Sequence, residues 1–127
     1  MMLRLLLDTH VFLWWLADAP ELTDRARKAI ADERNEVFVS AATGWEIGIK
    51  RATGKLRAPD NLDAMVEDSG FAPLPITFFH GEQAGALPMH HKDPFDRLLV
   101  AQAQAEGLVI VTRDPWIPKY GVRTLGA

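Results

Sequence analysis

The sequence predicts a single α/β domain built on a parallel sheet. Three short apolar runs, at residues 3–7, 37–39 and 108–111, have the composition of strands that are buried on both faces. The chain between them is long enough for helical crossovers. Strands that alternate with helices form a parallel sheet with right-handed connections and helices on both faces. We therefore expect a three-layer α/β/α architecture with a central parallel sheet.

The first crossover helices have recognisable N-terminal caps. Thr23 is suited to cap a helix that runs to about residue 32 and has a periodic apolar face. Ser40 directly follows the second apolar run and is the expected cap of a helix that ends in a basic pair, Lys50 and Arg51. These positions predict a βαβ unit followed by a third helix.

The middle of the chain predicts two further helices around a weak strand. Asn61 is expected to begin a helix that extends to Gly70. Residues 71–76 are extended but rich in proline, so an edge strand or a loop is expected there. Thr77 is suited to cap a helix over 78–87.

The C-terminal part predicts one more helix and one short strand. A helix is expected from about Phe95 to Glu106, with Gly107 as its C-terminal stop. Residues 122–125 could add a last strand. Trp14 and Trp15 fall on an expected helix, where core packing is the first interpretation and a dimer contact the second; base stacking is not expected of either.

Composition limits the classes of function. The chain has 127 residues, 48% of them hydrophobic, which suits one globular domain over 1–127. It has no cysteine, which excludes disulfides, thiolate metal sites and a thiol nucleophile and favours the cytoplasm. The N-terminal apolar run stops at Asp8, too early for a secretory core or a membrane span. A net charge of −3 argues against binding nucleic acid by bulk charge.

Acidic residues follow each of the three predicted strands. Asp8 and Asp114 come just after the first and third strands, and Glu46 lies in the helix after the second. The carboxyl ends of parallel strands share one edge, so these three carboxylates are expected to converge. The position of Asp96 depends on the orientation of its helix and stays open at this point. A carboxylate cluster favours Mg²⁺ or Mn²⁺, which suits phosphodiester hydrolysis.

Four segments together resemble the PIN domain, and specifically the VapC toxins of bacterial VapBC pairs. Their order and spacing span nearly the whole chain. They read Leu-Leu-Asp-Thr-His at 6–10, Ser-Ala-Ala-Thr-Gly-Trp-Glu-Ile at 40–47, Asp-Pro-Phe-Asp-Arg-Leu-Leu-Val-Ala-Gln-Ala at 93–103, and Val-Thr-Arg-Asp at 111–114.

The resemblance implies a site and an activity. It makes Asp8, Glu46, Asp96 and Asp114 the acidic quartet and metal ligands, with Thr112 as a supporting hydroxyl. Members of this family are Mg²⁺-dependent endoribonucleases, for which Mn²⁺ is an expected substitute. They are commonly homodimeric and are neutralised by a cognate VapB-type antitoxin whose tail lies over the active site. An RNA substrate and such partners are therefore expected here, with no membrane association.

Some assignments near the motifs remain alternatives. Asp93 lies one helical turn before Asp96, so either could point into the site; Asp96 is favoured because it directly precedes the apolar run of the motif. Arg97 and Arg113 are expected to contact the substrate, with structural pairing as an equal alternative, and the same pair of interpretations applies to Lys50 and Lys92.

The two adjacent histidines, His90 and His91, are expected to be solvated in a loop outside the site. Glu46 and Asp114 also have simpler interpretations, since Glu46 could pair with Lys50 at i+4 and Asp114 could belong to a turn with Pro115.

Other functions fit the sequence less well. An aspartate-nucleophile phosphatase would need a second Asp where His10 stands, and a receiver domain would need paired acids after its first strand and a Lys after its last. A DNA flap nuclease would need more acidic residues and a longer chain. The remaining alternative is a catalytically silent PIN-fold module that binds RNA or protein.

Overall fold

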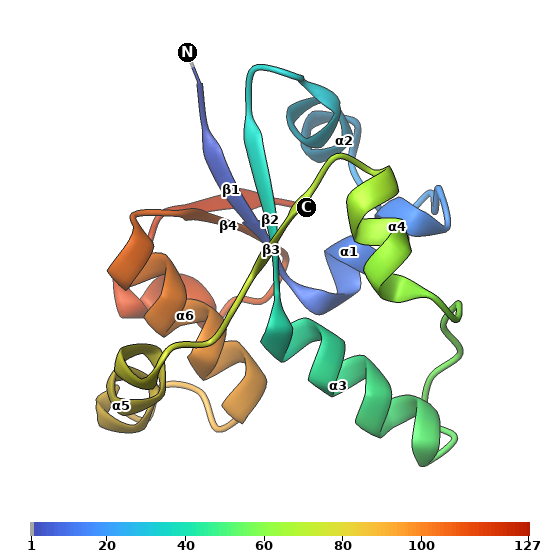
Figure 1. Ribbon diagram of the computed structural model, residues 1–127. Helices are drawn as coiled ribbons and strands as arrows, with labels where there is room; N and C mark the ends of the chain where they lie inside the picture. The colour runs from blue at the N-terminus through green and yellow to red at the C-terminus, as the bar shows by residue number, and fades with distance from the viewer. Residues whose placement is uncertain (1) are drawn as a thin grey trace.

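The computed structural model describes residues 2–127 as a parallel sheet between two layers of helices (Figure 1). The sheet has five strands in the order β3-β2-β1-β4-β5, and every neighbouring pair is parallel. The strands are β1 (Arg4–Leu7), β2 (Glu36–Ser40), β3 (Ala72–Leu74), β4 (Val109–Thr112) and β5 (Thr124–Gly126). The predicted α/β class and parallel sheet are confirmed.

The helices divide between the two faces of the sheet and its carboxyl end. In Figure 1, α1, α2 and α4 lie on the opposite side of the sheet from α5 and α6, and α3 continues from the end of β2. The helices are α1 (Thr9–Leu16), α2 (Asp24–Ala31), α3 (Ala41–Ala52), α4 (Leu62–Asp68), α5 (Phe78–Ala86), α6 (Pro94–Glu106) and the short 3₁₀ helix η1 (Ile117–Tyr120). Within residues 2–127, no helix has the length and apolar character that crossing a bilayer requires.

The sheet is buried on both faces because most side chains of its central strands are apolar. Leu5 and Leu7 of β1 pack in the cluster that contains α1 and α2, whereas Leu6 packs in the cluster that contains α6. Successive side chains on a strand point to opposite faces, so one continuous apolar run supplies both cores. Trp14 and Trp15 pack against the first cluster, as expected from core packing.

Several helices begin or end at the residues that were predicted to cap them. Thr23 accepts a hydrogen bond from the backbone of Ala26, and Ser40 accepts one from that of Ala42. Gly107 ends α6 with a φ of 68°, a left-handed conformation that glycine adopts without strain. Asn61 precedes α4 but forms no capping hydrogen bond through its side chain.

The proline-containing strand β3 lies at an edge of the sheet, one of the two predicted alternatives. It pairs only with β2, with Val39 opposite Pro73. Proline has no N–H to donate, so an edge position is where the sheet tolerates it. The last strand also forms, since β5 pairs with β4 in the register Val111 opposite Leu125.

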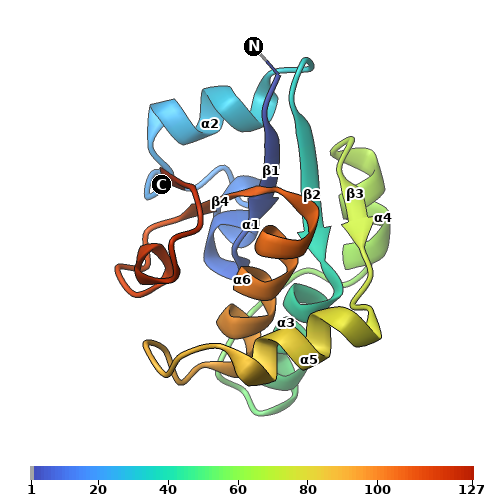
Figure 2. The ribbon, with the colours of Figure 1, turned by 90° about the vertical axis from the view of Figure 1, so that its left-hand side faces the viewer.

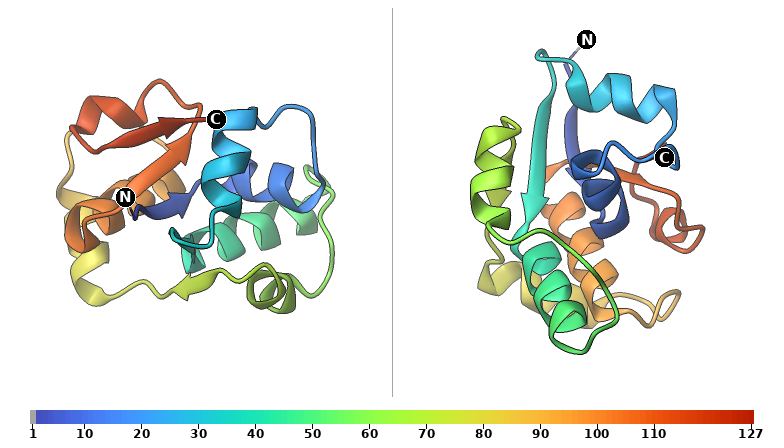
Figure 3. Two further views of the ribbon diagram at one scale, coloured as in Figure 1. Left: turned by 90° about the horizontal axis from the view of Figure 1, so that it is seen from above. Right: turned by 90° about the vertical axis from the view of Figure 1, so that its right-hand side faces the viewer.

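The chain changes direction in the sheet beside β1. It passes from β1 outward through β2 to β3 and then returns to β4 on the other side of β1. Figure 2 shows β1 and β2 running toward the end of the sheet where α3 begins, and Figure 3 shows the same arrangement from above and from the side. In open α/β sheets, ligands bind at the carboxyl ends of strands on either side of such a switch point. A ligand-binding site is therefore expected at the loops after β1 and β4.

Candidate active site

A cleft of about 490 Å³ opens at these loops and gathers all four predicted carboxylates. A fifth carboxylate, that of Asp93, joins them, so both alternatives of the pair Asp93 and Asp96 line the same space. The acidic residues that line the cleft are Asp8, Glu46, Asp93, Asp96 and Asp114.

Asp8 lies at the junction of β1 and α1, and both of its oxygens are engaged. Its Oδ1 accepts a hydrogen bond of 2.9 Å from the backbone N–H of Val11, which makes Asp8 the N-cap of α1. Its Oδ2 accepts a hydrogen bond from the Thr112 hydroxyl. Burial raises the pKa of Asp8 above its usual value, although both hydrogen bonds act in the opposite direction. The two hydrogen bonds fix the orientation of this buried carboxylate.

Thr112 connects the ends of β1 and β4. It is the last residue of β4 and is buried. Its hydroxyl donates to Asp8 and accepts a hydrogen bond of 3.0 Å from the backbone N–H of Asp114. The predicted supporting hydroxyl is therefore positioned between two of the carboxylates.

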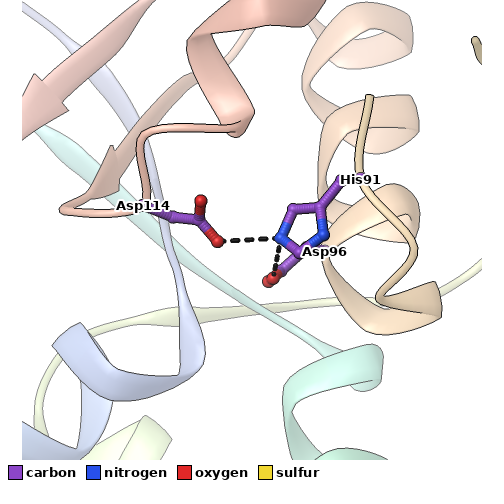
Figure 4. Close-up of side chains that lie close together, drawn as sticks. All are labelled: His91, Asp96 and Asp114. Carbon is purple, nitrogen blue, oxygen red and sulfur yellow. Dashed lines mark hydrogen bonds and ion pairs between the residues drawn. The ribbon is translucent and has the colours of Figure 1, made fainter. Parts of the chain in front are cut away.

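Two acidic residues at the start of α6 have different surroundings. Asp93 is the N-cap, and its Oδ1 accepts hydrogen bonds of 2.8 Å from the N–H of Phe95 and 3.2 Å from that of Asp96. Asp96, one turn later, faces Asp114 across the cleft through His91 (Figure 4). Burial, reinforced by the charge of Asp93, raises the pKa of Asp96 to about 7.

His91 belongs to the cluster, so the prediction that placed it in solvent was wrong. Its Nε2 lies 2.8 Å from Oδ2 of Asp114 and 2.9 Å from Oδ2 of Asp96. Its Nδ1 accepts a hydrogen bond from the backbone N–H of Asp93, which leaves the proton on Nε2. Burial lowers the pKa of His91, but the hydrogen bond to Asp114 and the charge of Asp96 outweigh that effect and raise it overall.

A local signal for His91 existed in the sequence. His91 stands two residues before the helix cap Asp93, close enough to bind its backbone N–H. The partner Asp114, by contrast, is 23 residues away and meets His91 only through the fold. The adjacent His90 turns away and packs edge-on against Tyr120, with 5.0 Å between ring centroids.

Glu46 is held as a buried ion pair on α3. Its carboxylate contacts Lys50, one turn later, and accepts a hydrogen bond of 2.6 Å from the Thr9 hydroxyl. This contact raises the pKa of Lys50, since Glu46 stabilises the charged ammonium. The structural pairing anticipated for Lys50 is therefore present, although Lys50 also lines the cleft.

The two arginines next to the acidic motifs are bound to backbone carbonyls. Arg97 is buried, and its guanidinium donates to four backbone carbonyls in and beside the α5–α6 loop, those of Ala84, Leu87, Pro88 and His91. Its side chain is not among those that line the cleft, and the structure shows the second of the two alternatives, structural pairing, by which Arg97 holds the loop. Arg113 does line the cleft, but donates to the carbonyls of Glu21 and Ala127.

The donor set suits a hard divalent cation. One atom each from His91, Asp96 and Asp114 lie within 4.8 Å of one another, and Asp8 lines the same cleft. Lys50 pairs with Glu46, whereas Asp96 and Asp114 share the single imidazole of His91. Oxygen-rich sites with excess negative charge are those that Mg²⁺ and Mn²⁺ prefer. The residues present therefore fit the expected ion.

The model of the family called PIN domain matches residues 5–122 of the chain, a span that includes every residue of this cleft. The chain belongs to the PIN-domain family. This PIN domain is 32% identical over 121 residues to Ribonuclease VapC22 of Mycobacterium tuberculosis (strain ATCC 25618 / H37Rv), a match that covers 89% of this chain and 88% of that protein. Over 66 residues, 49% of this chain and 47% of the relative, it is 33% identical to Ribonuclease VapC16 of the same organism.

Solved structures share the fold of this PIN domain. A chain in the crystal structure of VapBC2 from Rickettsia felis, bound to a promoter DNA fragment, superposes with a TM-score of 0.72 at 16% identity. A chain in the DNA-bound VapBC structure from Salmonella typhimurium gives 0.69 at 24% identity. Each match covers 98% of both chains. The three-layer PIN fold expected from the sequence is thereby confirmed.

Proposed function

We propose that this PIN domain is a divalent-metal-dependent endoribonuclease and the toxin of a type II toxin-antitoxin module. The observation that supports this most directly is the carboxylate cluster at the switch point, where Asp8, Asp96 and Asp114 lie in one cleft. The similarity to a protein named Ribonuclease VapC22 over 89% of the chain supports RNA as the substrate. The absence of cysteine agrees with action in the cytoplasm.

In this proposal Asp8, Asp96, Asp114 and Glu46 hold Mg²⁺, or Mn²⁺ in its place. When bound, such an ion polarises a phosphoryl oxygen and lowers the pKa of a water molecule for attack on phosphorus. Thr112 orients the Asp8 carboxylate, and Thr9 with Lys50 orients the Glu46 carboxylate at the wall of the cleft. Asp93 keeps the start of α6 in place through its capping hydrogen bonds.

Cleavage of a mixed pool of structured cellular RNAs by the purified PIN domain tests the proposal. We expect discrete cuts with Mg²⁺ or Mn²⁺, none with chelator, and none with Asp8→Asn, which keeps the volume of the side chain but removes its charge. Asp60→Asn is the matched control, because the Asp60 side chain is 91% exposed and lies outside the cleft. Cuts that persist in Asp8→Asn would contradict the proposal. Intact RNA in every lane would favour the silent binding module.

Thr112→Val should lower metal affinity or RNA cleavage without changing the shape of the site. Valine matches the volume of threonine but neither donates to Asp8 nor accepts from Asp114. Loss of such a supporting hydrogen bond typically costs about 10- to 100-fold in metal affinity or activity. We expect a fall of that size in single-turnover cleavage, with Thr124→Val on the edge strand β5 as the control. An unchanged rate would show that the Thr112 hydroxyl has no part in the reaction.

We further propose that the PIN domain binds a VapB-type antitoxin and forms a homodimer. The structural neighbours described as VapBC complexes support the first partner. An exposed apolar pair on α3 supports the second: Trp45 and Ile49 are 57% and 41% exposed and one helical turn apart. Light scattering at tens of micromolar should give twice the mass of the chain, and co-expressed antitoxin should suppress cleavage. A monomer would contradict the proposed homodimer. Full RNA cleavage in the presence of the co-expressed antitoxin would contradict the proposed antitoxin partner.

A further inference from the structure

The loop between α5 and α6, residues 87–93, carries His91 to two carboxylates of the acidic cleft. The His91 side chain is 16% exposed, and its Nε2 lies within hydrogen-bond distance of both Asp96 and Asp114 (Figure 4). Its Nδ1 accepts the backbone N–H of Asp93, so both ring nitrogens have partners. Hydrogen bonds weaken steeply with distance and angle, so the ring keeps these partners only while the backbone of His91 stays in place.

The phenol of Tyr120 holds that backbone. Its Oη accepts a hydrogen bond of 2.8 Å from the N–H of His91 and donates one of 2.8 Å to the carbonyl of Pro88. The guanidinium of Arg97 lies 3.4 Å from the same oxygen and donates to the carbonyls of both loop residues. A phenol hydroxyl can donate and accept at once, so this one oxygen binds both ends of the loop segment 88–91.

Tyr120 is itself attached to the segment that follows Asp114. It is the last residue of η1, whose first residue, Ile117, is fully buried, and both side chains pack in the apolar cluster that contains α6. The ring of Tyr120 also meets that of His90 edge-on. Tyr120 thus contacts both adjacent histidines, His91 through its hydroxyl and His90 through its ring, and joins their loop to the other wall of the cluster.

We propose that Tyr120 is a positioning residue, whose hydroxyl holds His91 against Asp96 and Asp114 and so fixes the orientation of these two carboxylates. Neither Tyr120 nor His91 is among the residues that line the cleft, so the support comes from behind the carboxylates. Without the hydroxyl, the N–H of His91 loses its acceptor, whereas the carbonyl of Pro88 keeps Arg97 as a donor. An amide without an acceptor is costly, so the loop should move toward water and carry the His91 ring with it. The effect on RNA cleavage rests on the proposed function, but the effect on His91 does not.

The imidazole N–H signals of ¹⁵N-histidine-labelled protein in chelator test the hold on His91 without any reaction. His91 and His80 share one arrangement, with Nδ1 on a backbone N–H and Nε2 on a carboxylate, so both should give a protected Nε2–H signal. In Tyr120→Phe, which keeps the ring in its apolar contacts, exchange of the His91 signal with water should be about 3- to 10-fold faster. The His80 signal is the internal control and should not change, because its partners are Thr77 and Glu106. An unchanged His91 signal overturns the inference.

A double-mutant cycle on single-turnover RNA cleavage tests whether Tyr120 acts through His91. We expect Tyr120→Phe to slow cleavage about 3- to 30-fold and His91→Ala about 10- to 100-fold, with the double variant no slower than His91→Ala. Two losses that multiply in the double variant would mean that Tyr120 acts by another route. That result, or an unchanged rate in Tyr120→Phe, overturns the positioning role.

Thr23→Ala is the control for a loss of stability alone. It removes the N-cap hydrogen bond of α2, and Thr23 is not among the residues that line the cleft. We expect it to lower the Tm but to leave the His91 signal and the cleavage rate unchanged. If the wild-type protein cuts no RNA, the proposed function fails, while the His91 signal still decides whether Tyr120 holds His91.

Discussion

Asp96→Asn is expected to reduce metal-dependent RNA cleavage by more than about 100-fold and, at the same time, to stabilise the metal-free protein. The loss of activity follows because a neutral amide replaces a proposed metal ligand, a larger change than the loss of a supporting hydrogen bond. The gain in stability follows because Asp96 is mostly buried beside Asp93, Asp114 and Asp8, whose charges disfavour its ionised form. We expect a gain of about 1 to 2 kcal/mol at pH 7.5, net of the lost contact with His91.

The stability gained by Asp96→Asn should increase as the pH rises. The pKa of Asp96 is about 7 in the folded protein and 3.8 as the ordinary value, so between these values the unfolded chain releases a proton that the folded protein keeps. The free energy of unfolding contributed by Asp96 therefore falls as the pH rises from about 4 to 7 and is constant above. The raised pKa of His91 acts in the same direction above pH 6.5.

Thermal unfolding in chelator at pH 4, 5.5 and 7.5 measures this effect. The difference in Tm between Asp96→Asn and the wild type should be near zero at pH 4 and reach about 3 to 8 °C at pH 7.5. Asp60→Asn, at an exposed position, is the control and should follow the wild type throughout. A destabilised Asp96→Asn at pH 7.5 would mean that its contact with His91 outweighs the repulsion.

Arg97→Ala is expected to cause the largest loss of stability, about 3 to 5 kcal/mol. The guanidinium donates to carbonyls in the last turn of α5 and in the loop that follows it, for example 2.8 Å to Ala84 and 3.0 Å to Leu87. Alanine leaves these acceptors without a donor, and each buried unsatisfied group costs about 1 to 3 kcal/mol. The same loop carries His91, whose carbonyl also accepts from Arg97, so the cluster should lose order with it.

Urea unfolding measures the change, with two variants as comparison. Arg97→Lys keeps the charge but lacks the planar fork that reaches several carbonyls, so we expect an intermediate loss. Arg25→Ala removes an exposed arginine from α2 and should cost less than about 0.5 kcal/mol. A loss below 1 kcal/mol for Arg97→Ala would show that water replaces the guanidinium at these carbonyls.

The local sequence determined the elements of this PIN domain because local forces form them. Residues 3–7 and 108–111 predict buried strands through apolar composition alone, and Thr23, Ser40 and Gly107 predict helix ends through hydrogen bonds to residues two to four positions away. The convergence of Asp8 with Asp114 could also be predicted from the sequence, because parallel strands bring their carboxyl ends to one edge of the sheet.

Tertiary structure decided which neighbours of the motifs belong to the cleft. Arg97 and Arg113 look equivalent in the sequence, yet one is buried on loop carbonyls and the other lines the cleft. His91 and His90 are adjacent, yet only His91 reaches Asp114. The physical reason is that these side chains are oriented by contacts with residues far away in the chain, and such contacts exist only after the sheet and α6 have packed.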